Sequence, residues 1–118
     1  MRKVTFLFLA STLMAMSCNS SQNLVNIQPE TGNLDIPAKG ELRVWKDLKH
    51  ASFDVVLTNA NPAQSCEAYY VKRDGTEKWI SPSLLANSKL TVHIPSDGHL
   101  FLKNFNPNTF TIGYEIKK

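Results

Sequence analysis

The chain has 118 residues, a length that suits one small domain. Its 13 lysines and arginines against 10 aspartates and glutamates give a formal net charge of +3. Without the basic pair at positions 2 and 3, which precedes an apolar stretch, the excess is 11 minus 10, or +1. The only other basic pairs are Lys72-Arg73 and Lys117-Lys118, whereas nucleic-acid binders carry a basic patch or stripe. We therefore exclude a nucleic-acid partner.

The first feature along the chain is a positive head followed by an apolar stretch. Arg2 and Lys3 precede the run from Val4 to Met16, which is interrupted only by threonine and serine. This is the layout of a secretory signal, and the run is shorter than the roughly 20 residues that a membrane-spanning helix needs. We therefore expect an exported protein.

The residues up to Cys18 resemble a known kind of export signal. The stretch LMAMSC, residues 13–18, resembles the lipobox of bacterial lipoproteins, with the small residue Ser17 before the cysteine. It departs from the usual pattern at Ala15, where an aliphatic residue such as leucine is typical. The resemblance implies that residues 1–17 are removed as a signal peptide and that Cys18 is lipidated. The alternative is an ordinary secreted protein that is cleaved nearby and keeps Cys18 free.

A lipid on Cys18 implies a bacterial cell-envelope protein that is held on a membrane. Two or three acyl chains anchor a protein almost permanently, because each buried methylene contributes about 0.8 kcal/mol. By resemblance to lipoprotein sorting, Asn19 in place of an aspartate favours the outer membrane, and the lack of an acidic cluster after Cys18 favours its periplasmic face. The sequence that follows has no second apolar segment of membrane-spanning length. We therefore expect a tethered domain.

Residues 18–33 separate the signal from that domain. They are mostly small and polar and contain Pro29 and Gly32, a composition that predicts a lipidated amino terminus and a flexible spacer. An alternative is that Leu24, Val25 and Ile27 form a first strand. The remaining residues, 34–118, are about 85 in number, which suits one small domain.

The domain alternates apolar and polar residues as β-strands do. The clearest stretches are ASFDVVLT (51–58), KLTVHI (89–94) and TFTIGYEI (109–116), in which every second residue is apolar. Four further strand-like runs cover residues 41–48, 66–72, 77–80 and 99–105. Many short strands at close spacing predict an all-β sandwich or barrel. We expect a small antiparallel two-sheet β-sandwich of seven or eight short strands.

Three glycine-containing pairs between these runs predict tight turns. Asp74-Gly75 and Asp97-Gly98 readily adopt the positive φ angles of a two-residue hairpin, and Lys39-Gly40 is a third such site. We therefore expect antiparallel hairpins at these positions.

Cys66 lies in a strand-like run in which Cys66, Ala68 and Tyr70 share one face. Unpaired cysteine is among the most buried residue types, and no histidine lies nearby in the sequence to lower the pKa of the thiol. If Cys18 carries lipid, Cys66 has no disulfide partner within the chain. We expect a buried, unreactive thiol, with pairing between two chains as the alternative.

The sequence lacks the short motifs that indicate a catalytic mechanism. It contains no G-x-S-x-G, no H-E-x-x-H and no glycine-rich phosphate loop. The histidines are His50, His93 and His99, and no spacing supplies a third ligand to a zinc pair made by the last two. We therefore expect no enzymatic activity, no metal and no cofactor, and strand histidines that face solvent.

Aromatic and amide side chains outside the apolar alternation are the candidate binding residues. Trp45 and Tyr69 lie on the polar faces of their strands, and Trp79 follows a hairpin turn. Exposed rings stack on sugars or anchor protein partners, although they also pack over the ends of a core. The stretch NFNPNTF adds Asn104 and Asn106, which favour a turn first and could also present amides to sugar hydroxyls.

Two classes of partner fit these features. The first is another envelope protein, with this chain as a non-catalytic interaction module, a subunit or accessory of an assembly. The alternative is a carbohydrate, bound by Trp45 and Trp79 with a nearby amide or carboxylate. Sugar binding requires an open ring face in a shallow groove with polar neighbours, whereas protein docking requires an apolar patch or an unpaired sheet edge.

Overall fold

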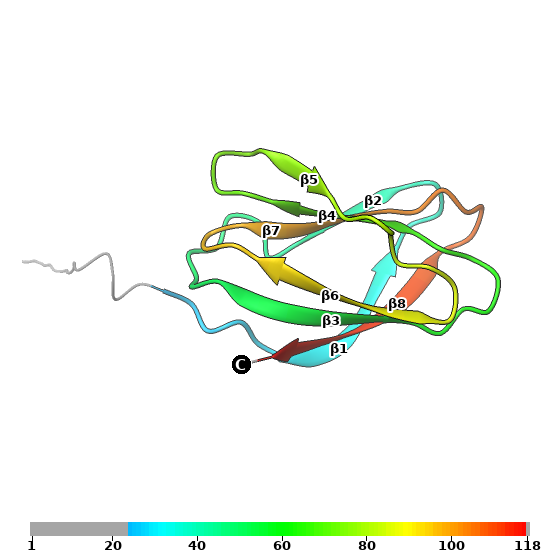
Figure 1. The fold of residues 1–118 in the computed structure, drawn as a ribbon, viewed down its shortest axis with the longest axis horizontal. Coiled ribbons are helices and arrows are strands. Elements are labelled where there is room, and N and C mark those ends of the chain that lie inside the picture. Colours follow the sequence, from blue (N-terminus) through cyan, green and yellow to red (C-terminus); the bar gives the residue numbers. More distant parts are fainter. Residues whose placement is uncertain (1–23, 118) are drawn as a thin grey trace, which may run out of the picture.

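The computed structural model describes residues 24–117, which form eight β-strands (Figure 1). The predicted signal peptide and the predicted lipidation site at Cys18 lie outside the described residues. In chain order the strands are β1 (Thr31–Ile36), β2 (Glu41–Val44), β3 (Phe53–Asn59), β4 (Glu67–Val71), β5 (Glu77–Trp79), β6 (Ser88–Ile94), β7 (His99–Lys103) and β8 (Phe110–Lys117).

The strands form two antiparallel sheets of four strands each. One sheet has the order β1-β8-β3-β6 and the other has the order β2-β7-β4-β5. All neighbouring strands in both sheets run antiparallel. Figure 1 shows the two sheets as two layers, one above the other. The predicted fold, an all-β antiparallel sandwich of two sheets, is confirmed.

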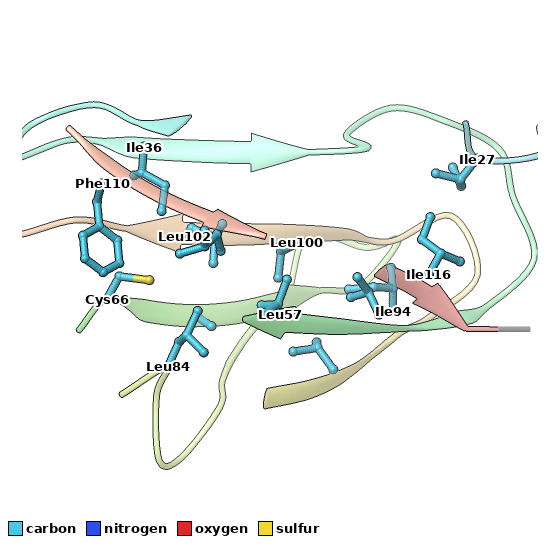
Figure 2. Packing of buried hydrophobic residues seen from close by; sticks show 14 residues of the cluster. Ile27, Ile36, Leu57, Cys66, Leu84, Ile94, Leu100, Leu102, Phe110 and Ile116 are labelled. Atoms are coloured by element: carbon cyan, nitrogen blue, oxygen red, sulfur yellow. The ribbon is translucent and has the colours of Figure 1, made fainter. Parts of the chain in front are cut away.

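The core lies between the sheets and is built from the alternate apolar residues of the strands. Val55 and Leu57 of β3 and Leu100 and Leu102 of β7 are buried in one continuous cluster. Figure 2 shows Leu57, Leu100 and Leu102 packed together from the two sheets. Each such side chain contributes about 1.5–3 kcal/mol by leaving water. The period-two pattern of the sequence is thus the physical origin of the two-layer fold.

Cys66 belongs to this core. It is 2% exposed, and its backbone N–H and C=O each form a 3.1 Å hydrogen bond with the backbone of Leu84. Burial raises the pKa of the Cys66 thiol to about 12. The prediction of a buried thiol is confirmed, and a thiol that stays protonated is a poor nucleophile.

The domain begins nearer the amino terminus than the sequence predicted. β1 starts at Thr31 and pairs with β8, and the backbone N–H of Ile116 donates to the carbonyl of Glu30 at 2.7 Å. Ile27 is 9% exposed and packs into the core cluster (Figure 2). The boundary at residue 33/34 is therefore wrong, because Ile27 closes one end of the core and β8 offers an edge for pairing. Residues 24–27 do not form the alternative first strand.

Only one of the three predicted hairpins joins neighbouring strands. Asp74-Gly75 lies between β4 and β5, where Gly75 has a φ of 91°. Lys39-Gly40 and Asp97-Gly98 instead carry the chain from one sheet to the other, because β1 and β6 belong to one sheet and β2 and β7 to the other. Lys39 and Asp97 do have positive φ angles, 49° and 59°. Each of the three pairs has one residue with a positive φ angle, whereas the predicted two-residue hairpin needs two. A tight turn also does not determine which sheet receives the next strand.

Replacing Ile27 with alanine tests whether the segment before β1 is part of the domain. We expect Ile27→Ala to lower the free energy of unfolding by about 2 kcal/mol, because a buried isoleucine loses its contacts and leaves a cavity. Urea unfolding of the purified protein, followed by tryptophan fluorescence, measures the change. The control is Leu24→Ala, at a half-exposed position, with an expected change below about 0.5 kcal/mol. Equally small changes in both variants would contradict the assignment.

Candidate binding site

The outer face of the β2-β7-β4-β5 sheet carries a row of aromatic side chains. Phe101, Tyr69 and Trp79 are register partners on β7, β4 and β5, so their side chains lie on the same side of the sheet. This side is the outer one, because Leu100 and Leu102, which flank Phe101, point into the core. The outer face of the other sheet presents mainly charged side chains, threonines and asparagine. The two outer faces therefore differ in chemistry.

Arg43 of β2 covers the innermost ring of this row. Its guanidinium carbon lies 3.8 Å from the centroid of the Phe101 ring, and Phe101 is only 2% exposed although it lies on the outer face. The Nη2 group of Arg43 donates to Oε2 of Glu77 at 2.9 Å, and Nη1 lies 2.9 Å from Nε2 of His99. A guanidinium can only donate, so Nε2 of His99 accepts and the ring is neutral. Burial, followed by the charge of Arg43, lowers the pKa of His99.

Tyr69 lies next in the row. Its ring centroid is 5.3 Å from that of Phe101, and Nζ of Lys103 lies 5.4 Å from the centroids of both rings. The Tyr69 hydroxyl donates to Oε1 of Glu67 at 2.7 Å. Tyr69 therefore stays half-buried under its neighbours, with its hydroxyl fixed beside a carboxylate.

A groove of about 480 Å³ opens at the end of the sandwich beside Trp79. Three of its lining side chains are large, apolar and exposed: Trp79 (57%), Leu85 (49%) and Phe105 (66%). They belong to β5, the β5–β6 connection and the β7–β8 connection, so folding gathers them from three separate segments. Glu67 is the one charged residue among those that line this space. We call it the apolar groove.

Hydrogen bonds fix the side chains on the rim of the apolar groove. The indole N–H of Trp79 donates to Oγ of Ser83 at 2.9 Å. The amide of Asn106 donates to the carbonyl of Ser65 at 3.2 Å and to Oδ1 of Asn104 at 2.8 Å. A ring that is already oriented loses less conformational freedom when it binds a partner. The rim side chains are thus already oriented within the domain.

Trp45 does not join Trp79 at this site. β2 ends at Val44, so the alternation that placed Trp45 on the outer face does not extend to it. Its ring packs edge-on against Phe53, with centroids 5.2 Å apart, and against Tyr114, with centroids 5.6 Å apart. Both partners come from the other sheet. The prediction that Trp45 presents its ring on a polar face is therefore wrong.

Asn104 is a structural residue. It is 1% exposed, and its Nδ2 donates to the carbonyls of Ile36, Pro37 and Asn108 at 3.2, 3.1 and 2.9 Å. Its Oδ1 accepts from the backbone N–H of Asn106 at 2.8 Å. These bonds tie the β7–β8 connection to the end of β1. The prediction that Asn104 presents an amide to a ligand is wrong, because its polar atoms satisfy buried backbone groups instead.

Sequence reasoning missed Leu85 and Phe105. The sequence placed Phe105 in the strand-like run of residues 99–105, but β7 ends at Lys103 and Phe105 lies in the connection that follows. The turn-forming residues Asn104 and Asn106 on either side of it were the available signal. Leu85 follows Leu84, which is fully buried in the core. The sequence does not show which of two adjacent leucines outside a strand faces inward. Periodicity identifies the buried side of a strand but has no equivalent in a connection.

The three histidines lie in different surroundings. His93 is exposed on β6, and its Nδ1 lies 2.7 Å from Oδ1 of Asp54 on the neighbouring strand. His99 is 8% exposed on β7 of the other sheet, and His50 is buried with both ring nitrogens 2.7 Å from backbone carbonyl oxygens. Solvent-facing histidine was thus the right prediction for His93 and wrong for His99. Within residues 24–117, no three histidine, cysteine, aspartate or glutamate side chains are grouped so that they could hold a metal ion.

Comparison with known proteins gives this chain no relatives. No protein-family model, curated protein or solved structure matches it. In the part of the chain that the structure describes, no helix is long and apolar enough to cross a membrane.

The environment of His99 makes stability depend on pH. Because the pKa of His99 is lowered in the folded state, its stabilising neutral form is fully present above the unfolded pKa of about 6.5 and is lost as the pH falls through the folded pKa. We expect His99→Gln, whose amide oxygen accepts from Arg43 without titrating, to lose less stability than the unmodified protein between about pH 7 and about pH 5. Urea unfolding at both pH values measures the loss.

Around pH 8, small changes in pH should alter the free energy of unfolding of the unmodified protein and of His99→Gln alike, since His99 is then neutral in both the folded and the unfolded state. Parallel stability profiles from about pH 8 to about pH 5 would contradict the assigned environment of His99.

Proposed function

We propose that the protein is a lipid-anchored lipoprotein of the bacterial cell envelope that binds another envelope protein through the apolar groove and catalyses no reaction. The observation that carries the binding part is the convergence of Trp79, Leu85 and Phe105, all exposed, around one groove. The lipobox-like stretch that ends at Cys18 supports the anchor. By the same resemblance, the anchor is placed in the outer membrane with the domain on the periplasmic side.

The chemistry of the apolar groove favours a protein segment as its occupant. Large apolar residues gathered at one exposed place mark interaction sites, and aromatic anchors supply most of the binding energy of protein interfaces. The lining includes one carboxylate, Glu67, and no lysine or arginine. A segment with apolar anchors and one basic side chain would therefore match both the shape and the charge of the groove.

The carbohydrate alternative has less support from the same residues. It used two tryptophans, and Trp45 packs against Phe53 and Tyr114. It also needs polar groups that can bond sugar hydroxyls, but the Asn106 amide already donates to two acceptors and the Ser83 hydroxyl accepts from Trp79. The apolar side chains of the rim are exposed, whereas several of its polar groups already form hydrogen bonds within the domain. This balance supports docking of a protein over binding of a sugar.

Substitutions on the rim test the proposed interaction. We expect Trp79→Ala and Phe105→Ala each to reduce recovery of a stoichiometric protein partner by about tenfold or more, as loss of an interface anchor does. Affinity purification of the tagged lipoprotein from cross-linked membranes, with quantitative mass spectrometry, measures the recovery. Val56→Ala, on the outer face of the other sheet, is the matched control and should recover the partner at the normal level.

Recovery that is unchanged in both rim variants, or the lack of any stoichiometric partner, would count against protein docking. Glycan binding by the unmodified protein that is lost in Trp79→Ala would instead support the carbohydrate alternative.

The anchor has its own test at Cys18. We expect the mature protein from membranes to begin at Cys18 with acyl chains attached, and Cys18→Ser to abolish both the added mass and the membrane attachment. Mass spectrometry of the intact mature protein and of its amino-terminal peptide measures this. An unmodified, water-soluble protein from the natural sequence would refute the proposed anchor.

A further inference from the structure

The two ends of the sandwich differ in charge. The connections beside the apolar groove, residues 37–40, 60–66, 80–87 and 104–109, contain one charged residue, Lys39. The connections at the opposite end, residues 45–52, 72–76 and 95–98, contain four basic and three acidic residues. We call them the groove end and the charged end. Strand register confirms this grouping, since Phe53 pairs with Ile94 at one end and Asn59 with Ser88 at the other.

The chain reaches the domain at the charged end. The backbone N–H of Val25 donates to the carbonyl of Lys49 at 2.6 Å, and the N–H of Ile116 donates to the carbonyl of Glu30. Between these two bonds, Ile27 is buried in the core. Figure 1 shows this segment running to β1 along the side of the molecule where β8 ends. Residues 25–30 are therefore held against the charged end at three points.

The length of chain before this attachment limits the distance to a lipid on Cys18. Five residues, 19–23, separate Cys18 from Leu24. A fully extended chain spans at most about 3.5 Å per residue, so the two Cα atoms lie no more than about 20 Å apart. A strand of seven residues such as β3 is itself about 20 Å long. A lipid on Cys18 would therefore hold the charged end close to the membrane. The groove end lies farther from the tether by about the length of the strands.

The surface around the entry point suits the boundary between lipid headgroups and acyl chains. Leu24 is 52% exposed and Val25 is 44% exposed, and they are the first described residues after the tether. Lys49 and Lys117 are exposed nearby: Lys49 accepts from Val25 through its carbonyl, and Lys117 lines the same surface hollow as Val25. The connections of this end carry a net excess of only one positive charge, four minus three, so electrostatic attraction to anionic lipid is weak. The apolar pair and the short tether are the stronger constraints.

We infer that the domain stands on the lipid surface through its charged end, with Leu24 and Val25 in the headgroup region, so that the apolar groove points away from the bilayer. This orientation rests on the lipid anchor of the proposed function. It deepens that proposal, because it places the partner of the groove on the side remote from the membrane that holds the anchor. Amphipathic contacts of this kind bury a small apolar face at the interface while lysines reach the headgroups.

Site-specific quenching in vesicles tests the orientation. The full lipoprotein, purified from membranes, is placed in vesicles of phosphatidylethanolamine and phosphatidylglycerol that contain a headgroup nitroxide lipid. A fluorescent maleimide is attached to Ser96→Cys at the charged end or to Asn108→Cys at the groove end, both exposed positions. Cys66 is buried and should stay unlabelled. We expect quenching at position 96 to be several-fold stronger than at position 108, and to decrease in a Leu24→Ser, Val25→Ser double variant.

The outcomes separate this inference from the proposal on which it rests. Equal quenching at the two positions, or stronger quenching at 108, overturns the orientation. Unchanged quenching at 96 in the double variant overturns the role of Leu24 and Val25. The intact mass of each preparation shows whether Cys18 carries lipid: a lipidated protein without the quenching difference overturns only the orientation, whereas an unlipidated protein overturns the anchor and the orientation together.

Discussion

The packing of two apolar sheet faces is the constraint on which the rest of the domain depends. Cys66, the one cysteine of residues 24–117, is free, so no disulfide within this range holds the sheets together. The cluster that includes Leu57, Leu100 and Ile112 must supply the stability of a small domain through burial alone. Since the inner faces of the strands serve this packing, apart from the buried Asn59 of β3, only the outer faces and the ends of the sandwich are available for contact with other molecules.

The three rings of the aromatic row on the outer face differ in how much of their surface is exposed. Exposure rises along the row, from the buried Phe101 through the half-buried Tyr69 to Trp79, which is more than half exposed. Arg43 and Lys103 cover the first two rings with cationic groups that stay hydrated at their outer side. Trp79 lies on the last and shortest strand of the sheet, beyond the reach of this cover. The apolar groove therefore begins at Trp79, the ring of the row that neither Arg43 nor Lys103 covers.

The parts of the structure that sequence predicted are those governed by local periodicity. Strands β3, β6 and β8 alternate apolar and polar residues along most of their length, and the burial of Cys66 was expected from its residue type in a strand-like run. β1 escaped detection because TGNLDI offers only Leu34 and Ile36, and it is stabilised by pairing with β8, a long-range interaction. The choice between a hairpin and a crossing to the other sheet depends on core packing, which the residues of the turn do not contain. The apolar groove could not be predicted from the sequence for the same reason. Trp79, Leu85 and Phe105 come from three separate segments and meet only when the whole domain has folded.

The distribution of charge between the two ends is consistent with different tasks for them. A charged side chain at a binding surface must lose water when a partner arrives, and that loss is repaid only by a well-placed opposite charge. The groove end keeps Lys39 as the only charged residue of its connections and is otherwise rich in prolines, serines and asparagines, of which Asn104 and Asn106 bond their side-chain amides within the domain. Glu67, which belongs to β4 and not to a connection, is the one charged residue that lines the apolar groove. At the opposite end, the side chains of Lys46, Asp47 and Arg73 stay in water, whereas Asp97 is largely buried and accepts from the backbone N–H of His50. The strands hold the two ends about 20 Å apart. Residues of the groove end can therefore be substituted without changing the contacts that hold residues 25–30 at the charged end.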